Sequence, residues 1–187
     1  MIKRNLGLIV KLYVNHIALA VYGLLMAIIG LTIGEKSMDG NPVISYIFGG
    51  IAVILYLGIL YVNFWELGAS DKIKIDGGRL EYNKFTGLII SLFANIPTIL
   101  FGILGMLSGY IQSEFLEFSR IIDHYYSGMY ISILGALSRG EALVFPPIYL
   151  LIAVPALVTS MVSYILGAKG YRCLFPEPKK QQERNKE

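Results

Sequence analysis

The chain has 187 residues and a formal net charge of +3, and 55% of its residues are hydrophobic while only 16% are charged. A soluble domain covers its core with roughly 25% charged residues, so this composition excludes an ordinary soluble globular protein. The mean hydropathy of +0.61 indicates an integral membrane protein instead.

Long apolar segments without Asp, Glu, Lys or Arg occur at intervals along the chain. A helix needs about 20 apolar residues to cross a bilayer. The sequence therefore predicts an all-α, polytopic integral membrane protein, built as a bundle of four transmembrane helices over residues 12–34, 43–65, 85–110 and 142–167.

The first segment has some features of a secretory signal. Lys3 and Arg4 precede an apolar run, and residues 18–20 have the small-residue pattern of a cleavage site. However, Lys11 interrupts the run, and apolar sequence continues past residue 20 as far as Gly34. A signal peptide has a shorter apolar core, so we interpret this segment as an uncleaved first helix.

The basic residues indicate the orientation of the chain. All but three of the 16 Lys and Arg residues lie before the first span, between the second and third, or after the fourth; the exceptions are Lys36, Arg120 and Arg139. Basic flanks remain in the cytoplasm. We therefore expect a plasma-membrane protein with cytoplasmic termini, a cytoplasmic loop over 66–84, an outer loop over 111–141 and a charged cytoplasmic tail over 169–187.

The predicted cytoplasmic loop has an alternating pattern of its own. Apolar and polar residues alternate on either side of Asp76-Gly77-Gly78. Asp-Gly is a strong signal for a β-hairpin turn, which predicts a hairpin over 72–82 that lies on headgroups or on a partner. The alternative is a solvated connector without regular structure.

The outer loop contains apolar residues at helical spacing. Steps of three and four residues predict an amphipathic helix in the outer membrane interface, with an apolar stripe formed by Phe115, Phe118, Ile122, Tyr125 and Met129. Residues 129–140 are apolar but too short to cross. They either dip into the membrane and return or continue the interfacial helix.

Small residues and prolines predict how the spans pack. Pairs at a spacing of four allow close approach of helices in lipid, and Pro97 and Pro155 predict kinks in the third and fourth spans. The pairs are Gly30/Gly34, Gly105/Gly109, Ala156/Ser160 and Ser163/Gly167.

Motifs for catalysis or cofactor binding are weak. Cys173 is the single cysteine, and His16 and His124 fall on opposite sides of the predicted membrane, so we expect no metal site. Adjacent residues on a helix point about 100° apart, which disfavours Asp123 and His124 as a catalytic pair. We expect no cofactor and no nucleic-acid partner, because the basic tail is more simply a solvated end.

Polar side chains recur in the cytoplasmic halves of all four predicted spans. Such groups are costly in lipid unless they face the bundle and find partners. They predict either a site that opens toward the cytoplasm or hydrogen bonds between helices that set their register. The residues are Asn15, His16, Asn63, Ser91, Asn95, Ser160 and Ser163.

Three functional hypotheses follow. The first is a non-enzymatic accessory or assembly subunit that acts through a membrane partner, based on its packable glycine faces and weak catalytic motifs. The second is an oligomeric channel or transporter for a small solute, in which several copies line a pore with Asn and Ser. The third is a membrane-embedded lipid-modifying enzyme that uses His16 or the Asp123/His124 region.

Overall fold

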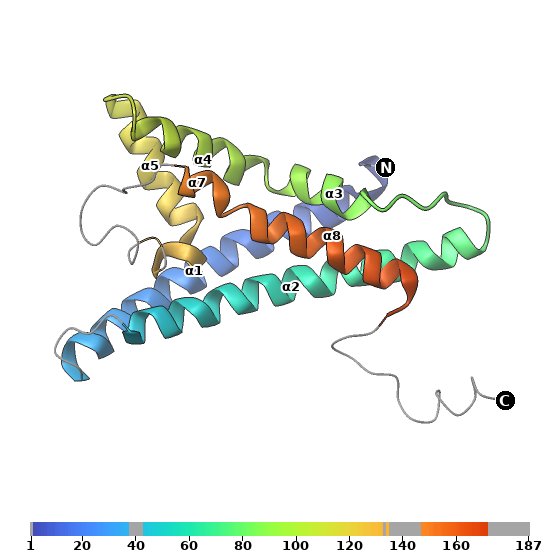
Figure 1. Ribbon diagram of the computed structural model, residues 1–187, viewed down its shortest axis with the longest axis horizontal. Coiled ribbons are helices and arrows are strands. Elements are labelled where there is room, and N and C mark those ends of the chain that lie inside the picture. The colour runs from blue at the N-terminus through green and yellow to red at the C-terminus, as the bar shows by residue number, and fades with distance from the viewer. Residues whose placement is uncertain (1, 38–42, 133, 135–146, 172–187) are drawn as a thin grey trace.

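The computed structural model describes residues 2–37, 43–132, 134 and 147–171, and all regular elements in these ranges are helical (Figure 1). The prediction of an all-α protein is therefore confirmed for the described residues. The elements are η1 (Lys3–Asn5), α1 (Leu6–Ser37), α2 (Val43–Asp76), α3 (Thr86–Ala94), α4 (Ile96–Ser108), α5 (Glu114–Tyr126), η2 (Gly128–Tyr130), α7 (Ile148–Leu151) and α8 (Val154–Lys169).

Three helical segments of the described chain are long and apolar enough to cross a membrane. They run over Lys3–Ile33, Val43–Asp76 and Ile148–Lys169. The pair formed by α3 and α4 is a fourth if it is counted as one span, although the two helices are bent by 62° at their junction. The first five residues of the predicted fourth span, 142–146, lie outside the described residues.

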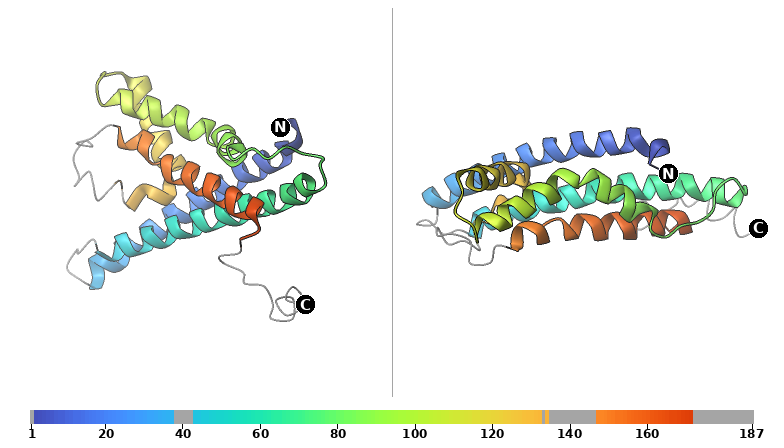
Figure 2. Two further views of the ribbon diagram at one scale, coloured as in Figure 1. Left: turned by 45° about the vertical axis from the view of Figure 1, so that its right-hand side comes forward. Right: turned by 90° about the horizontal axis from the view of Figure 1, so that it is seen from above.

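The two longest helices form the base of the bundle. In Figure 1, α1 and α2 run antiparallel along the long axis, and α8 lies along α2. Helices α4 and α5 lean away from this base at the end opposite the N-terminus, and α5 then turns back toward α1 (Figures 1 and 2). We call the end that carries the N-terminus, Asp76 and Lys169 the basic end.

Glycines allow the close approaches that hold these layers together. Gly68 of α2 faces Tyr164 and Ala168 of α8, and an added side chain there would clash with the α8 backbone. Gly167 of α8 faces the α2 backbone at Trp65 in the same way. Small residues let helices approach closely in lipid, so α2 and α8 form the tightest seam of the fold.

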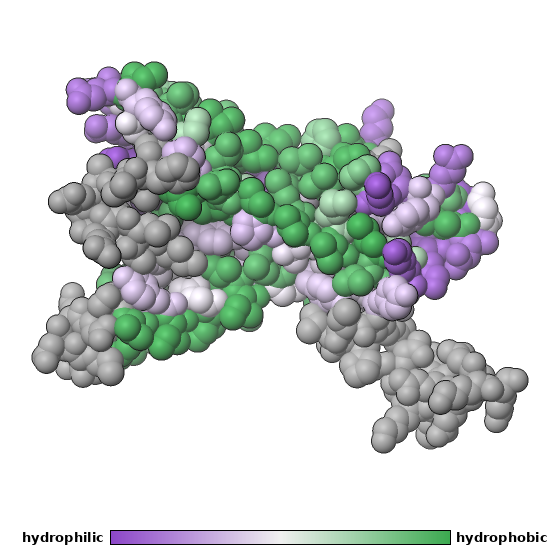
Figure 3. All heavy atoms as spheres, viewed as in Figure 1, coloured by the Kyte–Doolittle hydropathy of each residue, from purple (hydrophilic) through white to green (hydrophobic). Residues whose placement is uncertain are grey.

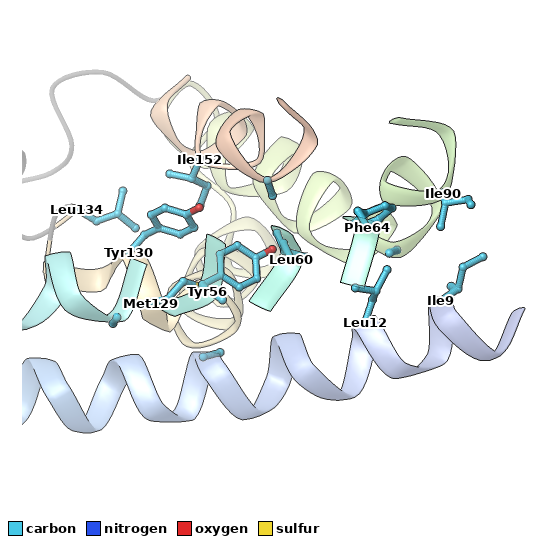
Figure 4. Close-up of a cluster of buried hydrophobic side chains, with 14 residues drawn as sticks. Ile9, Leu12, Tyr56, Leu60, Phe64, Ile90, Met129, Tyr130, Leu134 and Ile152 are labelled. Atoms are coloured by element: carbon cyan, nitrogen blue, oxygen red, sulfur yellow. The ribbon is translucent and has the colours of Figure 1, made fainter. Parts of the chain in front are cut away.

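The buried core follows the seam and continues to the middle of α1. Figure 4 shows Phe64 and Ile90 toward one end of the cluster and Met129, Tyr130 and Leu134 toward the other. The last three residues come from η2 and the residues after it, which insert between α1 and α2. Met129, the last residue of the predicted apolar stripe, and the residues that follow it therefore supply part of the core.

The surface is divided by polarity. Figure 3 shows hydrophobic residues across the middle of the visible face. Hydrophilic residues gather at its right-hand end and at the upper-left tip, where α4 and α5 meet. This distribution is typical of a protein whose middle is surrounded by hydrocarbon.

The predicted hairpin over 72–82 is wrong. Helix α2 continues through the predicted loop as far as Asp76, and a turn at Gly77 and Gly78 follows, in which Gly78 has a φ of 66°. Gly68, Asp71 and Ile75 recur at steps of three and four, so this stretch has a helical period as well as an alternating one. Their face lies against α8, where Asp71 is fully buried, and this packing favours the helix.

The predicted third span is broken rather than continuous. Helix α3 ends at Ala94 and α4 begins at Ile96, with Asn95 between them. Pro97 lies in the first turn of α4, where its missing N–H costs no hydrogen bond. Pro155 occupies the same position in α8, after a break that separates α7 from α8. At both prolines, the predicted kink is therefore a break between two helices, and the proline lies in the first turn of the second helix.

Candidate functional site

A polar cluster lies at the centre of the bundle, where the end of α5 meets α1 and α2. His16 of α1 is 6% exposed, and its ring stacks on Tyr126 with centroids 4.4 Å apart. Its Nε2 lies 3.1 Å from the Tyr126 carbonyl oxygen and its Nδ1 lies 3.2 Å from the Tyr56 hydroxyl. Because a carbonyl only accepts, Nε2 carries the proton in the neutral ring and Nδ1 accepts from Tyr56.

Asp123 belongs to the same region of α5 and is fully buried. Its Oδ1 accepts a long hydrogen bond of 3.5 Å from the Ser127 hydroxyl, whereas its Oδ2 has no partner in the described structure. Burial raises the pKa of the Asp123 carboxyl to about 7, and the hydrogen bond from Ser127 opposes that rise. Asp123 is thus a buried acid that can change its charge near neutral pH.

The junction of α3 and α4 lies beside this cluster. The Tyr13 hydroxyl, one turn before His16 on α1, donates to the Phe93 carbonyl oxygen at 2.7 Å. Asn95 is 3% exposed, and its Nδ2 donates to the Ser91 carbonyl at 2.8 Å. In the first turn of α4, the Thr98 hydroxyl is buried and interacts with the Tyr126 side chain of the cluster.

The structure does not gather the predicted polar layer around one space. Three of its members are buried but bond to their own helices: Asn63 to Ile59 at 2.7 Å, Ser160 to Ala156 at 2.7 Å and Ser163 to Thr159 at 2.6 Å. Ser91 is paired with Asn95 within one turn, at 3.2 Å. His16 joins two other elements, α2 and α5, and Asn15 lines a separate groove between α1 and α2.

The predicted outer helix exists as α5, and its apolar stripe is divided. Phe115, Phe118 and Tyr125 are exposed, with fractions of 64%, 60% and 63%. Ile122 is half-buried, and Met129 lies in η2, in the core. The inner face of α5 is largely polar and is formed by Leu116, Ser119, Asp123 and Ser127. The helix thus has its polar side inside and its apolar side outside.

Asp123 and His124 diverge, as their adjacent positions on a helix require. Asp123 faces the interior, whereas the His124 ring packs on Tyr149 of α7 with centroids 5.4 Å apart. The His124 Nδ1 lies 2.9 Å from the Arg120 carbonyl oxygen. The two residues therefore form no dyad. Sequence reasoning missed Asp123 as a buried group because an interfacial helix would place its polar side in water.

A second buried acid, Asp71, was also missed. Its Oδ2 accepts from Arg4 Nη2 at 2.9 Å and from the Tyr164 hydroxyl at 3.3 Å, and its Oδ1 lies 3.2 Å from Lys74 Nζ. Asp71 thus ties η1, α2 and α8 together at the basic end. The signal was its position three residues after Gly68, on the same helical face.

The described residues contain no group of three His, Cys, Asp or Glu side chains that could hold a metal ion. Cys173 lies outside the described residues. Comparison of the chain with protein-family models, with curated proteins and with solved structures gave no match. The functional argument therefore depends on the geometry of the central cluster.

Proposed function

We propose that this chain is a multi-pass integral membrane protein of the plasma membrane that transports a proton or a small cation through its central polar cluster. The single observation that carries the transport role is Asp123, which is fully buried and has one oxygen without a partner in the described structure. An ionisable residue at membrane depth is costly and is usually retained for function.

The inside-out pattern of α5 supports immersion in lipid. In water, a helix packed on a protein turns its polar side outward. Here Ser119 and Asp123 face inward while Phe118 and Tyr125 are exposed, an arrangement suited to a hydrocarbon surrounding. Glu114 and Glu117 lie in the first turn, where the polar interface and the helix dipole both favour acids. With 13 residues, α5 reaches inward without crossing.

Charge supports the orientation with both termini in the cytoplasm. The basic end carries Lys3, Arg4, Lys72, Lys74 and Lys169. Away from the basic end, the described chain carries Lys36 near the end of α1 and Arg120 midway along α5. The positive-inside rule places the basic end in the cytoplasm.

Two features beside Asp123 suit a transport site. The α3/α4 junction interrupts a helix at membrane depth, and transporters use such interruptions to expose backbone groups to ions. The C-terminus of α5, where Tyr126 offers its carbonyl to His16, presents the negative end of a helix dipole. Asp123, His16 and these helix ends together form a centre that favours a proton or small cation.

The test is flux through purified protein in liposomes. With a pH-sensitive or a Na⁺-sensitive dye inside and an imposed K⁺ diffusion potential, we expect the wild type to conduct protons or Na⁺ well above empty liposomes. Asp123→Asn should reduce this flux at least tenfold. Asp76→Asn, which alters an exposed acid at the end of α2, should not. Wild-type flux equal to that of empty liposomes for protons, Na⁺ and K⁺ would contradict the proposal.

A second candidate is a non-catalytic subunit of a membrane assembly. Most of the glycines that suggested it pack within the chain, since Gly30 faces Ser45 and Gly105 faces Tyr149. The observation that still favours it is the apolar outward side of α1, where Val14, Ile17 and Val21 are more than half exposed. Mass measurement after extraction in mild detergent tests it: a stoichiometric second polypeptide supports a subunit role, and a single chain opposes it.

A further inference from the structure

Two adjoining hollows lie between α1 and α2, with volumes of about 490 and 240 Å³. Both are lined by Asn15, Leu55 and Ile59, so they form one continuous channel along the helix pair, which we call the α1/α2 groove. Neither His16 nor Asp123 lines it. It is therefore distinct from the central cluster.

The groove changes character along its length. At the end nearer the basic end it is lined by Lys11 and Glu66, next to Asn15. At the other end it is lined by Leu19, Tyr22 and Leu55. A helix rises about 16 Å from Lys11 to Tyr22, and one leaflet of a bilayer contributes about half of its roughly 30 Å hydrocarbon thickness. The groove therefore has the length and polarity of one leaflet.

The polar end offers one positive and one negative group to the same ligand. Lys11 and Glu66 are both exposed, and neither forms an ion pair within the described chain. Asn15 is half-buried, and its amide has no hydrogen-bond partner among the described residues. Acyl chains cannot satisfy these groups, but a zwitterionic headgroup can, because it carries an ammonium and a phosphate a few ångströms apart.

We propose that the α1/α2 groove binds one phospholipid of the cytoplasmic leaflet whose headgroup carries a primary ammonium, as in phosphatidylethanolamine. Glu66 accepts from the ammonium, while Lys11 and Asn15 donate to the phosphate. One acyl chain lies along Leu19, Tyr22 and Leu55. This inference rests on the membrane location proposed above and is independent of the transport role.

The charges discriminate among lipids. Phosphatidylglycerol has no ammonium, so it leaves the Glu66 carboxylate beside a net negative headgroup. Phosphatidylcholine keeps the positive charge, but its trimethylated nitrogen donates no hydrogen bond. The primary ammonium is therefore the group that Glu66 selects, and Lys11 contributes to binding of any phospholipid.

The experiment offers lipids in competition. The full chain is purified in mild detergent, delipidated, and incubated with equal amounts of the three phospholipids with identical acyl chains. Native mass spectrometry then counts the lipids retained. We expect one retained lipid per chain, with phosphatidylethanolamine favoured at least fivefold. Glu66→Gln should abolish that preference, whereas Glu81→Gln, an exposed acid in the turn after α2, should preserve it.

Two glycines of α2 provide a matched steric test. A Cβ atom added at Gly58 or at Gly50 meets no atom of another segment within 4 Å, so both variants are expected to fold. Only Gly58 lines the groove. Gly58→Leu should therefore fill the groove and reduce lipid retention at least fivefold, while Gly50→Leu should retain lipid as the wild type does.

The outcomes separate this proposal from the transport proposal. Equal retention of all three lipids, or unchanged retention in Gly58→Leu, overturns the lipid site. So does a polypeptide that co-purifies with the wild type and is lost in Gly58→Leu. A chain that needs no detergent to remain in solution overturns the membrane location itself. Wild-type protein that retains lipid as expected but conducts no ions above empty liposomes contradicts the transport role alone.

Discussion

Two buried carboxylates, Asp71 at the basic end and Asp123 at the centre of the bundle, show how strongly the stability of a buried charge depends on its partners. Asp71 is surrounded by a guanidinium, an ammonium and a phenol, so its charge is matched in place. Asp123 is equally buried but receives a single long hydrogen bond, from Ser127. A buried charge without an opposite partner destabilises the fold, so Asp123 lowers stability whenever it is ionised.

This difference predicts a pH-dependent effect of Asp123→Asn on stability. The pKa of Asp123 in the folded protein is about 7, above the usual value of about 3.9. The folded state therefore holds the proton more tightly, and the free energy of unfolding falls as pH rises from about 4 to 7. Asparagine stays neutral. The variant should melt several degrees above the wild type at pH 8 and at the same temperature at pH 4.

Thermal unfolding in detergent across this pH range measures the effect. Asp76→Asn is the control, because Asp76 is exposed at the end of α2 and should give the wild-type profile. A wild type whose melting temperature does not fall between pH 4 and 7 relative to Asp123→Asn would disprove the assignment.

At the scale of elements, the long spans and the helical conformation of α5 could be predicted from the sequence, but the surroundings of each face of α5 could not. An apolar run of 20 or more residues is the length that a helix needs to cross a bilayer. This explains why α1 covers its predicted span and α2 begins at the predicted residue, although α2 continues past residue 65 to Asp76. For a shorter amphipathic helix, the periodicity of the sequence predicts an apolar face and a polar face. It does not predict whether each face contacts water, lipid or the rest of the protein. The period places Phe115, Phe118 and Tyr125 on one side of a helix, and all three are exposed, but nothing in the local sequence indicates that Asp123 is buried.

Immersion of α5 in lipid predicts that two neighbouring substitutions differ strongly in their effect on stability. Phe118→Asp places an acid on the exposed apolar face, and an aspartate at the centre of the hydrocarbon region costs about 2.5 to 3.5 kcal/mol. Glu117→Ala changes an exposed residue in the first turn and should have little effect. Melting temperatures in lipid nanodiscs compare the two. If α5 lay in water, Phe118→Asp would leave stability unchanged or raise it.

The seam between α2 and α8 predicts a steric effect at Gly68. A leucine there would meet the backbone of Tyr164 and Ala168, and overpacking of this kind costs about 1 to 3 kcal/mol or more. Gly50→Leu on the same helix meets open space and should cost much less. Thermal unfolding of both variants tests this, and equal stability would show that α2 and α8 do not approach as described.

At the scale of the whole molecule, charge separation was the most informative signal in the sequence. This signal is the number of Lys and Arg residues in each segment between spans, so an error of a few residues in the end of a helix does not change it. The helical extension of α2 to Asp76 changed the structure of the predicted loop without moving its basic residues to another end. By contrast, the centre of the bundle could not be predicted, because its contacts join residues from α1, α2, α5 and η2 that are far apart in sequence.

The orientation predicts the accessibility of introduced cysteines. In a chain with Cys173→Ser, Gln112→Cys between α4 and α5 should react with an impermeant maleimide added to intact cells. Glu81→Cys, in the turn after α2, should react only after the membrane is permeabilised. Both native side chains are exposed, so reactivity reports the side of the membrane. Labelling of Glu81→Cys in intact cells would reverse the proposed topology.

Asp71 has a mechanical consequence for the entire bundle. It fastens the N-terminal turn, α2 and α8 to one another at the basic end, whereas α4 and α5 splay from α1 and α2 at the far end (Figure 1). When helices are held together at one end, a rigid-body rotation displaces their other ends most. Any rigid-body opening of this protein must therefore pivot near Asp71, and its widest displacement falls at the tip that joins α4 to α5.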